Sequence, residues 1–215
     1  MRHRTAGTTT VLGLLFLASA QPATAQLWFF PDYAVPSANG TPSTFIAGTY
    51  GRGLNDASGK LDAIGAVIGR TGEQASFMGG LGFISGAGDD EITAGAAVGV
   101  DVAQSGSATV AVQGGVGWFS EASATFLRFP LGVSIKGMVV TPEAQIVPWV
   151  MPRVNISRVS SSGFSSTETD LGASGGISFS FPNGFGVHTA LDVLFSEDTL
   201  VLFGVGGHYV IGAQN

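Results

Sequence analysis

The sequence predicts an all-β protein: one closed antiparallel β-barrel that crosses a membrane with ten strands, or with eight as the alternative. Three observations support this prediction. Glycine accounts for 33 of the 215 residues, and only 11% of the residues are charged. Short segments alternate between large apolar and small residues. The sequence contains no run of about 18 apolar residues, which a membrane-spanning helix would need. Cysteine is absent, which excludes disulfides and cysteine-based zinc sites.

The first 25 residues have the layout of a secretory signal. A basic start, Met1–Arg4, is followed by a short apolar run, Val11–Ala18, and by the small-residue cleavage pattern Ala23-Thr24-Ala25. A buried N-terminal helix is the alternative. We therefore expect a signal peptide at 1–25, a proline-containing periplasmic leader at 26–42 and the barrel at 43–212.

The mature chain would be acidic. Removing the two signal-peptide arginines from the 9 Lys+Arg leaves 7 against 15 Asp+Glu, a net charge of −8. No basic stripe is present, so nucleic acid is not an expected partner.

Each strand is predicted from alternation with a period of two. The clearest example is Leu127–Lys136, in which every odd position is large and apolar and the even positions are Arg, Pro, Gly, Ser and Lys. The ten expected strands are 44–52, 60–70, 75–84, 92–102, 108–118, 127–136, 144–156, 170–181, 186–195 and 200–211.

The strand face opposite the large apolar residues indicates which side of the barrel meets water. A soluble barrel carries Lys and Glu on its outer face, but here that face is mostly Gly, Ser, Thr and Ala, and lysine occurs only at Lys60 and Lys136. The pattern is typical of a barrel whose large aliphatic residues face lipid while small polar residues and sparse charges fill the lumen. A soluble periplasmic lipid-binding barrel is the alternative.

The connections give an independent check. With the mature N-terminus in the periplasm, the periplasmic turns are Thr71–Glu73, Ala103–Ser107, Gly137–Thr141 and Pro182–Gly184, all short. The outward connections include Gly53–Gly59, Ser85–Asp90 and the longest, Ser157–Glu168, with shorter ones around Ser120–Ala122 and Ser196–Asp198. Short periplasmic turns and longer outer loops are typical of such barrels.

Two neighbouring strands carry a family resemblance. Phe129-Pro130-Leu131-Gly132-Val133 precedes a strand with Pro148-Trp149-Val150, and the pair resembles the small outer-membrane β-barrel proteins of Gram-negative bacteria. Gly206-x-x-Tyr209-x-Ile211 resembles the C-terminal assembly signal of that family. The resemblance covers roughly 43–212 and implies a bacterial outer-membrane location, with outer-membrane lipid and the barrel assembly machinery as partners. Members typically have eight strands, hence the alternative count.

The polar side chains predicted to face the lumen are the candidate site. Opposite charges in a narrow barrel normally pair, because an unpaired buried charge is costly. We therefore expect a stabilising polar network, and a narrow ion path is the alternative. Its residues are Asp101, Gln113, Arg128, Lys136, Arg153, Asp170, His188, Asp192 and His208.

Two of these residues are histidines. In a hairpin around Ser196–Asp198 in which the numbers of paired residues add up to 396, His188 would lie directly opposite His208. Both side chains would point inward, and Asp192 would follow four residues after His188 on the same face. Two imidazoles and a carboxylate could bind a metal or act as acid and base, but polar filling of the lumen is the simpler interpretation.

The sequence therefore favours an outer-membrane barrel with a structural or interaction role and a polar-plugged lumen. A narrow passive pore is the second hypothesis. Some outer-membrane barrels are lipid A deacylases or proteases, but their sites lie toward the outer face and no histidine lies in an outward loop. We therefore expect no enzymatic activity, no cofactor and no metal, and the sequence is silent on a small-molecule ligand.

Overall fold

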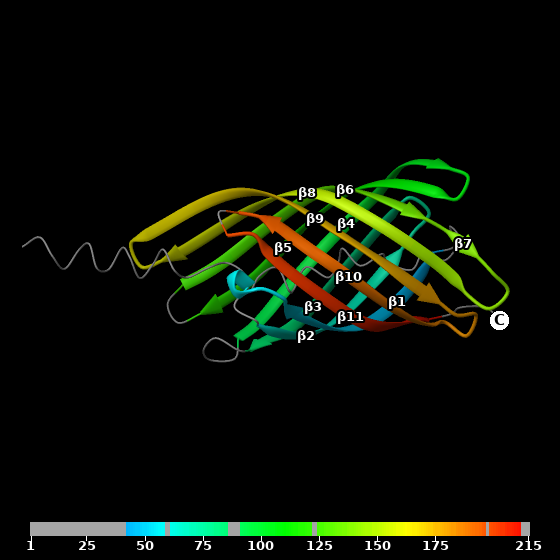
Figure 1. Cartoon of the computed structure of the whole chain (residues 1–215), viewed down its shortest axis with the longest axis horizontal. Helices are drawn as coiled ribbons and strands as arrows, with labels where there is room; N and C mark the ends of the chain where they lie inside the picture. Colours follow the sequence, from blue (N-terminus) through cyan, green and yellow to red (C-terminus); the bar gives the residue numbers. More distant parts are fainter. Residues whose placement is uncertain (1–41, 59–60, 86–90, 122–123, 197, 212–215) are drawn as a thin grey trace, which may run out of the picture.

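The computed structural model describes residues 42–58, 61–85, 91–121, 124–196 and 198–211. It is built from strands that run obliquely around one long axis (Figure 1). The elements are β1 (Ser43–Gly53), the short 3-10 helix η2 (Asp56–Ser58), β2 (Asp62–Thr71), β3 (Ala75–Ser85), β4 (Glu91–Ser105), β5 (Ala108–Glu121), β6 (Ala124–Gly137), β7 (Val139–Val140), β8 (Gln145–Ser161), β9 (Phe164–Ser180), β10 (Phe185–Phe195) and β11 (Leu200–Ile211).

The sheet closes on itself. Each strand pairs antiparallel with its neighbours in sequence, β1 also pairs with β11, and β6 also pairs with β8. The two-residue β7 follows β6 and pairs with the start of β8. Ten strands therefore form the wall, which confirms the predicted closed ten-stranded barrel rather than the eight-stranded alternative.

The barrel has two different ends. At the terminal end β1 begins and β11 finishes, with Thr44 opposite Ile211. Three tight turns lie at this end, at 72–74, 106–107 and 181–184, and Gly106 and Gly184 take the positive φ angles of 56° and 85° that favour glycine. At the opposite end, here called the loop end, η2 lies in the connection from β1 to β2.

The prediction of a long outer loop at 157–168 is wrong, because these residues form a paired hairpin. Strands β8 and β9 stay paired from Ser157 opposite Glu168 to Ser161 opposite Phe164, and Gly163 at φ 83° closes a two-residue turn. This hairpin projects from the barrel at the loop end (Figure 1). Its Ser and Thr residues give no apolar alternation, so the period-two signal ended before the backbone pairing did.

Two smaller corrections concern the terminal end. Strand β4 continues to Ser105, where a turn over 103–107 was expected, and a bulge after Asp101 keeps it in register with β5. The expected turn over 137–141 contains β7. The expected signal peptide 1–25 and most of the leader 26–42 lie outside the described residues, as do residues 59, 86–90, 122–123 and 197 of the outer connections, residue 60 of the expected strand 60–70, and residue 212.

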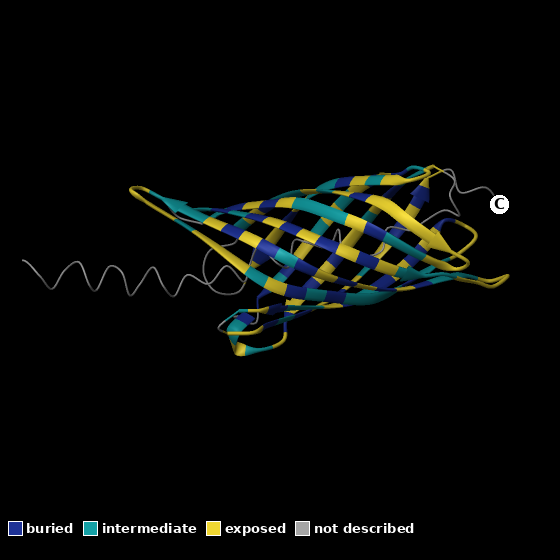
Figure 2. Cartoon of the chain, turned by 90° about the horizontal axis from the view of Figure 1, so that it is seen from above, coloured by how far each residue is buried: buried dark blue, intermediate teal, exposed yellow. Residues whose placement is uncertain are grey.

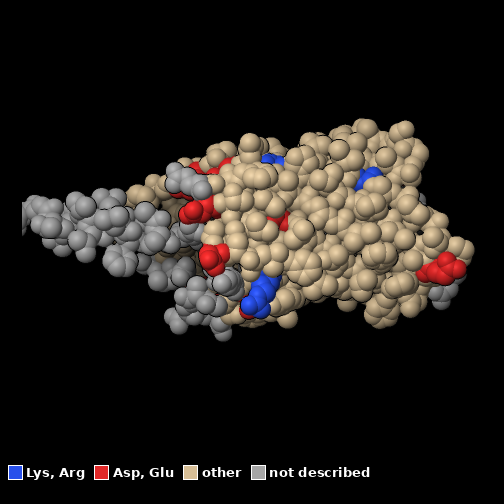
Figure 3. Space-filling view, viewed as in Figure 1, with Lys and Arg blue, Asp and Glu red and all other residues tan. Residues whose placement is uncertain are grey.

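The exterior of the barrel is apolar. Buried and exposed residues alternate along each strand (Figure 2), and the exposed positions carry large side chains such as Ile64, Leu81, Leu131 and Leu171, each 59–63% exposed. In Figure 3 the middle of this face carries few charges. Most of its Asp and Glu atoms lie toward the loop end, and a further acidic patch lies at the terminal end. A closed wall with such a surface suits lipid, because every strand finds its backbone partners within the wall. Within the described ranges, no helix is long and apolar enough to cross a membrane.

The interior is more apolar than expected at the loop end. Small polar residues and charges were expected throughout the lumen, yet Phe119 and Phe126 stack there with ring centroids 4.3 Å apart. Two further clusters of buried apolar side chains lie at the same end, one of Leu61, Ala63, Ile84 and Leu202 and one of Leu194 and Leu200. Segment 60–70 is apolar on both faces, so alternation could not show that Leu61 and Ala63 point into the barrel.

Candidate functional site in the barrel lumen

Arg153 organises the polar side chains inside the barrel. It lies on β8 and is 4% exposed. Its Nε donates to Asn155 Oδ1 on the same strand at 3.2 Å, and its terminal nitrogens donate to Ser174 Oγ on β9 and to the Asp192 carboxylate on β10. The guanidinium thus binds three strands together. Such a charge-assisted pair is what a buried arginine needs.

A second guanidinium lies close to this pair. Arg128 on β6 is 1% exposed, and its Nε donates to Ser157 Oγ on β8 at 3.0 Å. Its charge interacts with those of Arg153, Asp192 and Asp170. Two arginines and two carboxylates therefore share one region of the lumen, and their opposite charges balance.

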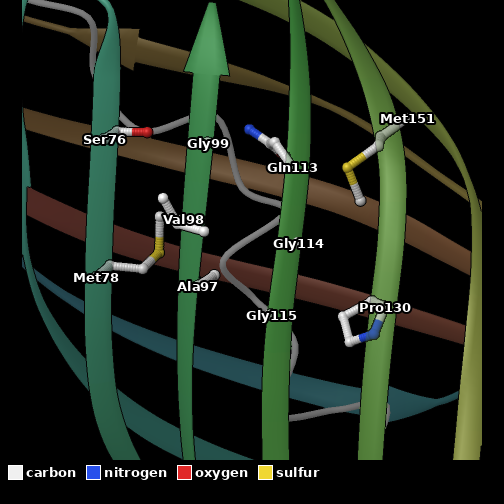
Figure 4. A pocket seen from close by; sticks show the side chains of 10 residues that line it. All are labelled: Ser76, Met78, Ala97, Val98, Gly99, Gln113, Gly114, Gly115, Pro130 and Met151. Carbon is white, nitrogen blue, oxygen red and sulfur yellow. The ribbon is translucent and has the colours of Figure 1, made fainter.

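The remaining expected residues lie apart from this group. Lys136 on β6 is half-buried and interacts electrostatically with Asp101, which is exposed at the bulge of β4. Gln113 on β5 lines a cavity of about 10 Å³ between β3, β4, β5, β6 and β8, together with Ser76, Met78 and Met151 (Figure 4). That volume holds at most about one water molecule.

His188 on β10 and His208 on β11 form a separate buried contact. Their Nδ1 atoms are 3.4 Å apart, and each residue is 5% exposed. On the far side of each ring, His188 Nε2 is 3.3 Å from Thr49 Oγ1 on β1, and His208 Nε2 is 3.0 Å from Ser180 Oγ on β9. Four strands therefore contribute to one chain of side chains near the terminal end.

The predicted register, in which His188 lies directly opposite His208, is wrong. Leu194 faces Leu200 at the end of the hairpin, which puts His188 opposite Gly206 and His208 opposite Gly186. A Cβ atom at Gly206 would collide with the His188 ring, and one at Gly186 with the His208 ring. The two glycines therefore leave the space in which the rings meet diagonally.

The neutral partners of the charged residues were not predicted from the sequence. Asn155, Ser157 and Ser174 bind the arginines, and Thr49 and Ser180 bind the histidines. All five share the inward side of their strands. Alternation could have placed them inside, but it could not show which of the many inward Ser and Thr residues have a partner.

No family model and no curated protein matches the sequence. Solved structures are similar in fold. The translocator domain of autotransporter NalP from Neisseria meningitidis has a TM-score of 0.51 and 14% identity, covering 94% of this chain and 99% of that one. The N-terminal β-barrel domain of Pseudomonas aeruginosa OprF (TM-score 0.39, 14% identity, 79% and 97% covered) and the outer membrane protease OmpT from Escherichia coli (0.39, 8%, 79% and 95%) are also similar.

At such identities the likeness concerns the fold alone, and one fold hosts many functions. The closed ten-stranded wall and its apolar exterior agree with that likeness. The chain has the fold of the bacterial outer-membrane β-barrels, and the prediction of an outer-membrane barrel is confirmed at this level.

Proposed function

We propose that this outer-membrane β-barrel has a structural or interaction role, with a lumen plugged by side chains and no catalytic activity. The observation that carries the proposal is the ion pair of Arg153 with Asp192, which joins β8 and β10 across Ser174. A conducting pore would need water where this pair and its neighbours lie.

Two physical arguments support a plugged lumen. Side chains largely fill the interior of small barrels, in contrast to the wide channels of 16-stranded porins. The inward side chains here are also large, among them Arg128, Phe119 and Met151, each 1% exposed. The apolar layer at the loop end would oppose the passage of ions because ions lose hydration there.

Single-channel recording in planar bilayers tests the plug against the narrow passive pore. We expect no conductance steps from the refolded protein. Asp192→Ala removes a carboxylate from the lumen, and Asp62→Ala removes one from the exterior, where Asp62 pairs with Arg52. Steps in the wild type whose size changes with Asp192→Ala but not with Asp62→Ala would overturn the plug in favour of the pore.

The absence of catalysis is tested with the substrates that other barrels process. Outer membranes carrying the protein are incubated with lipid A and with a peptide library, and His188→Asn serves as the comparison. We expect no product from either. Deacylation or cleavage by the wild type that His188→Asn lacks would contradict this part of the proposal.

Outer-membrane lipid and the barrel assembly machinery are the proposed partners. Tyr209 and Ile211 in the last strand face outward and are 36% and 49% exposed, as a recognition segment must be. Tyr209→Ala should lower the amount of folded barrel in cells while refolding into detergent in vitro proceeds as before. Equal loss in both settings would mean that Tyr209 supports folding itself.

An interaction role would use the projecting β8–β9 hairpin. Leu171 is the first residue of β9 that pairs with β10, so among the described strands the preceding segment Phe164–Asp170 pairs with β8 alone. Exposed strand edges of this kind accept further strands. Deleting 161–164, which spares the residues of β8 that pair with β6, should leave a folded barrel but reduce adhesion of the cells to protein-coated surfaces. Unchanged adhesion would contradict this role of the hairpin.

A further inference from the structure

The two buried imidazoles face each other head-on. Their ring centroids are 5.7 Å apart, the planes differ by 9°, and the Nδ1 atoms are 3.4 Å apart. The distance between the ring centroids exceeds the distance between the Nδ1 atoms by twice the distance from the centroid of an imidazole ring to its own Nδ1, which is the largest difference that the geometry allows. Both Nδ1 atoms therefore lie on the line between the ring centres, and each lone pair or N–H bond is aimed at the opposite nitrogen.

The neighbouring hydroxyls hold this orientation. Thr49 contacts Nε2 of His188 and Ser180 contacts Nε2 of His208, so each ring is fixed at the end remote from the pair. A hydroxyl can donate or accept. Either tautomer of each ring is therefore satisfied at Nε2, and both rings can present an unprotonated Nδ1 to a shared cation without losing these hydrogen bonds.

We propose that His188 and His208 form a linear two-coordinate site for a soft monovalent cation, Cu⁺ or Ag⁺, which replaces the proton of an Nδ1–H···Nδ1 hydrogen bond. The tautomer of one ring shifts when the cation binds, its proton moving from Nδ1 to Nε2. With metal–nitrogen bonds of about 2 Å, the Nδ1 atoms separate from the present 3.4 Å to about 4 Å, a small side-chain movement.

The geometry selects against divalent zinc. A tetrahedral ion needs lone pairs that meet at an angle and two further ligands, whereas these lone pairs are collinear and the hydroxyls bind the far nitrogens. Within the described part of the chain, no group of three or more His, Asp or Glu residues could hold a metal. A single positive charge between neutral imidazoles also costs less to bury than a double one.

Titration of the refolded full-length chain with silver nitrate tests the site. Calorimetry should give one Ag⁺ per chain, and ¹⁵N NMR should shift the Nδ1 signals of two histidines while the third, His3, serves as an internal reference. His188→Gln and His208→Gln should each abolish this binding. Gln113→Ala, another inward polar residue, is the matched control and should bind Ag⁺ as the wild type does.

Two further measurements keep the proposal falsifiable if a histidine variant does not fold. Thr49→Val and Ser180→Ala retain both rings but lose their support, and each should weaken Ag⁺ binding by about tenfold. Zn²⁺ should bind far more weakly than Ag⁺. Ag⁺ binding that survives both histidine substitutions, a shift confined to Nε2, or Zn²⁺ binding as tight as Ag⁺ would overturn the linear site.

Discussion

Replacing Asp192 with alanine should destabilise the barrel strongly, because it leaves the Arg153 charge buried without its carboxylate. The Arg153 side chain is 1% exposed and that of Asp192 is 17% exposed. Removing one partner of a buried ion pair typically costs 3–5 kcal/mol. Arg153 would keep Ser174 and Asn155 as hydrogen-bond acceptors, so we expect the lower part of this range, about 3 kcal/mol.

Equilibrium unfolding in urea, followed by tryptophan fluorescence in lipid vesicles, measures this loss. Asp62→Ala is the matched control. The Asp62 side chain is 39% exposed, and its carboxylate lies 3.7 Å from Arg52 and accepts a hydrogen bond from the Tyr50 hydroxyl. Exposed pairs contribute at most about 1 kcal/mol. The double variant Arg153→Met with Asp192→Leu should regain part of the stability. Equal losses for Asp192→Ala and Asp62→Ala would refute the reasoning.

Three further substitutions test the packing of the wall by the same unfolding assay. Gly206→Ala pushes a methyl group against the His188 ring and should cost about 1–3 kcal/mol, whereas Gly48→Ala, where the nearest atom is 3.9 Å away, should be nearly neutral; equal effects would contradict the close packing at Gly206. Phe119→Ala breaks the stacked pair of the apolar layer and should cost about 3–5 kcal/mol, and a loss below 1 kcal/mol would argue against that layer. Leu131→Arg puts a charge on the exterior at mid-strand and should cost about 2–4 kcal/mol in vesicles, a cost that would vanish if the exterior faced water.

The strands could be predicted from the sequence because alternation records which face meets lipid. Along β6, the odd positions Leu131, Val133 and Ile135 are exposed. The even positions Gly132 and Ser134 are buried, as the alternation along the strand predicts. The β8–β9 hairpin could not be predicted in the same way. Beyond Ser157 the two strands carry mostly serine and threonine, and these residues on both faces carry no record of a lipid side.

The alternation of odd and even positions also predicts which side chains point into the lumen, but it does not predict which of these side chains contact each other. Arg153 and Asp192 lie on strands that do not pair with each other, and Ser174 on β9 lies between them. Their contact depends on how far the arginine reaches across β9. The histidine pair depends on the exact centre of a hairpin, where an error of one residue shifts the register by two.

Cell fractionation combined with a heat-modifiability gel tests the central claim most directly. The precursor is expressed in a Gram-negative host, and the outer membrane and soluble periplasm are run on SDS gels with and without boiling. A closed barrel with this apolar exterior should appear in the outer membrane as a band whose mobility changes on boiling. A soluble periplasmic protein without a mobility change would contradict the assignment of the exterior to lipid and favour a soluble lipid-binding barrel.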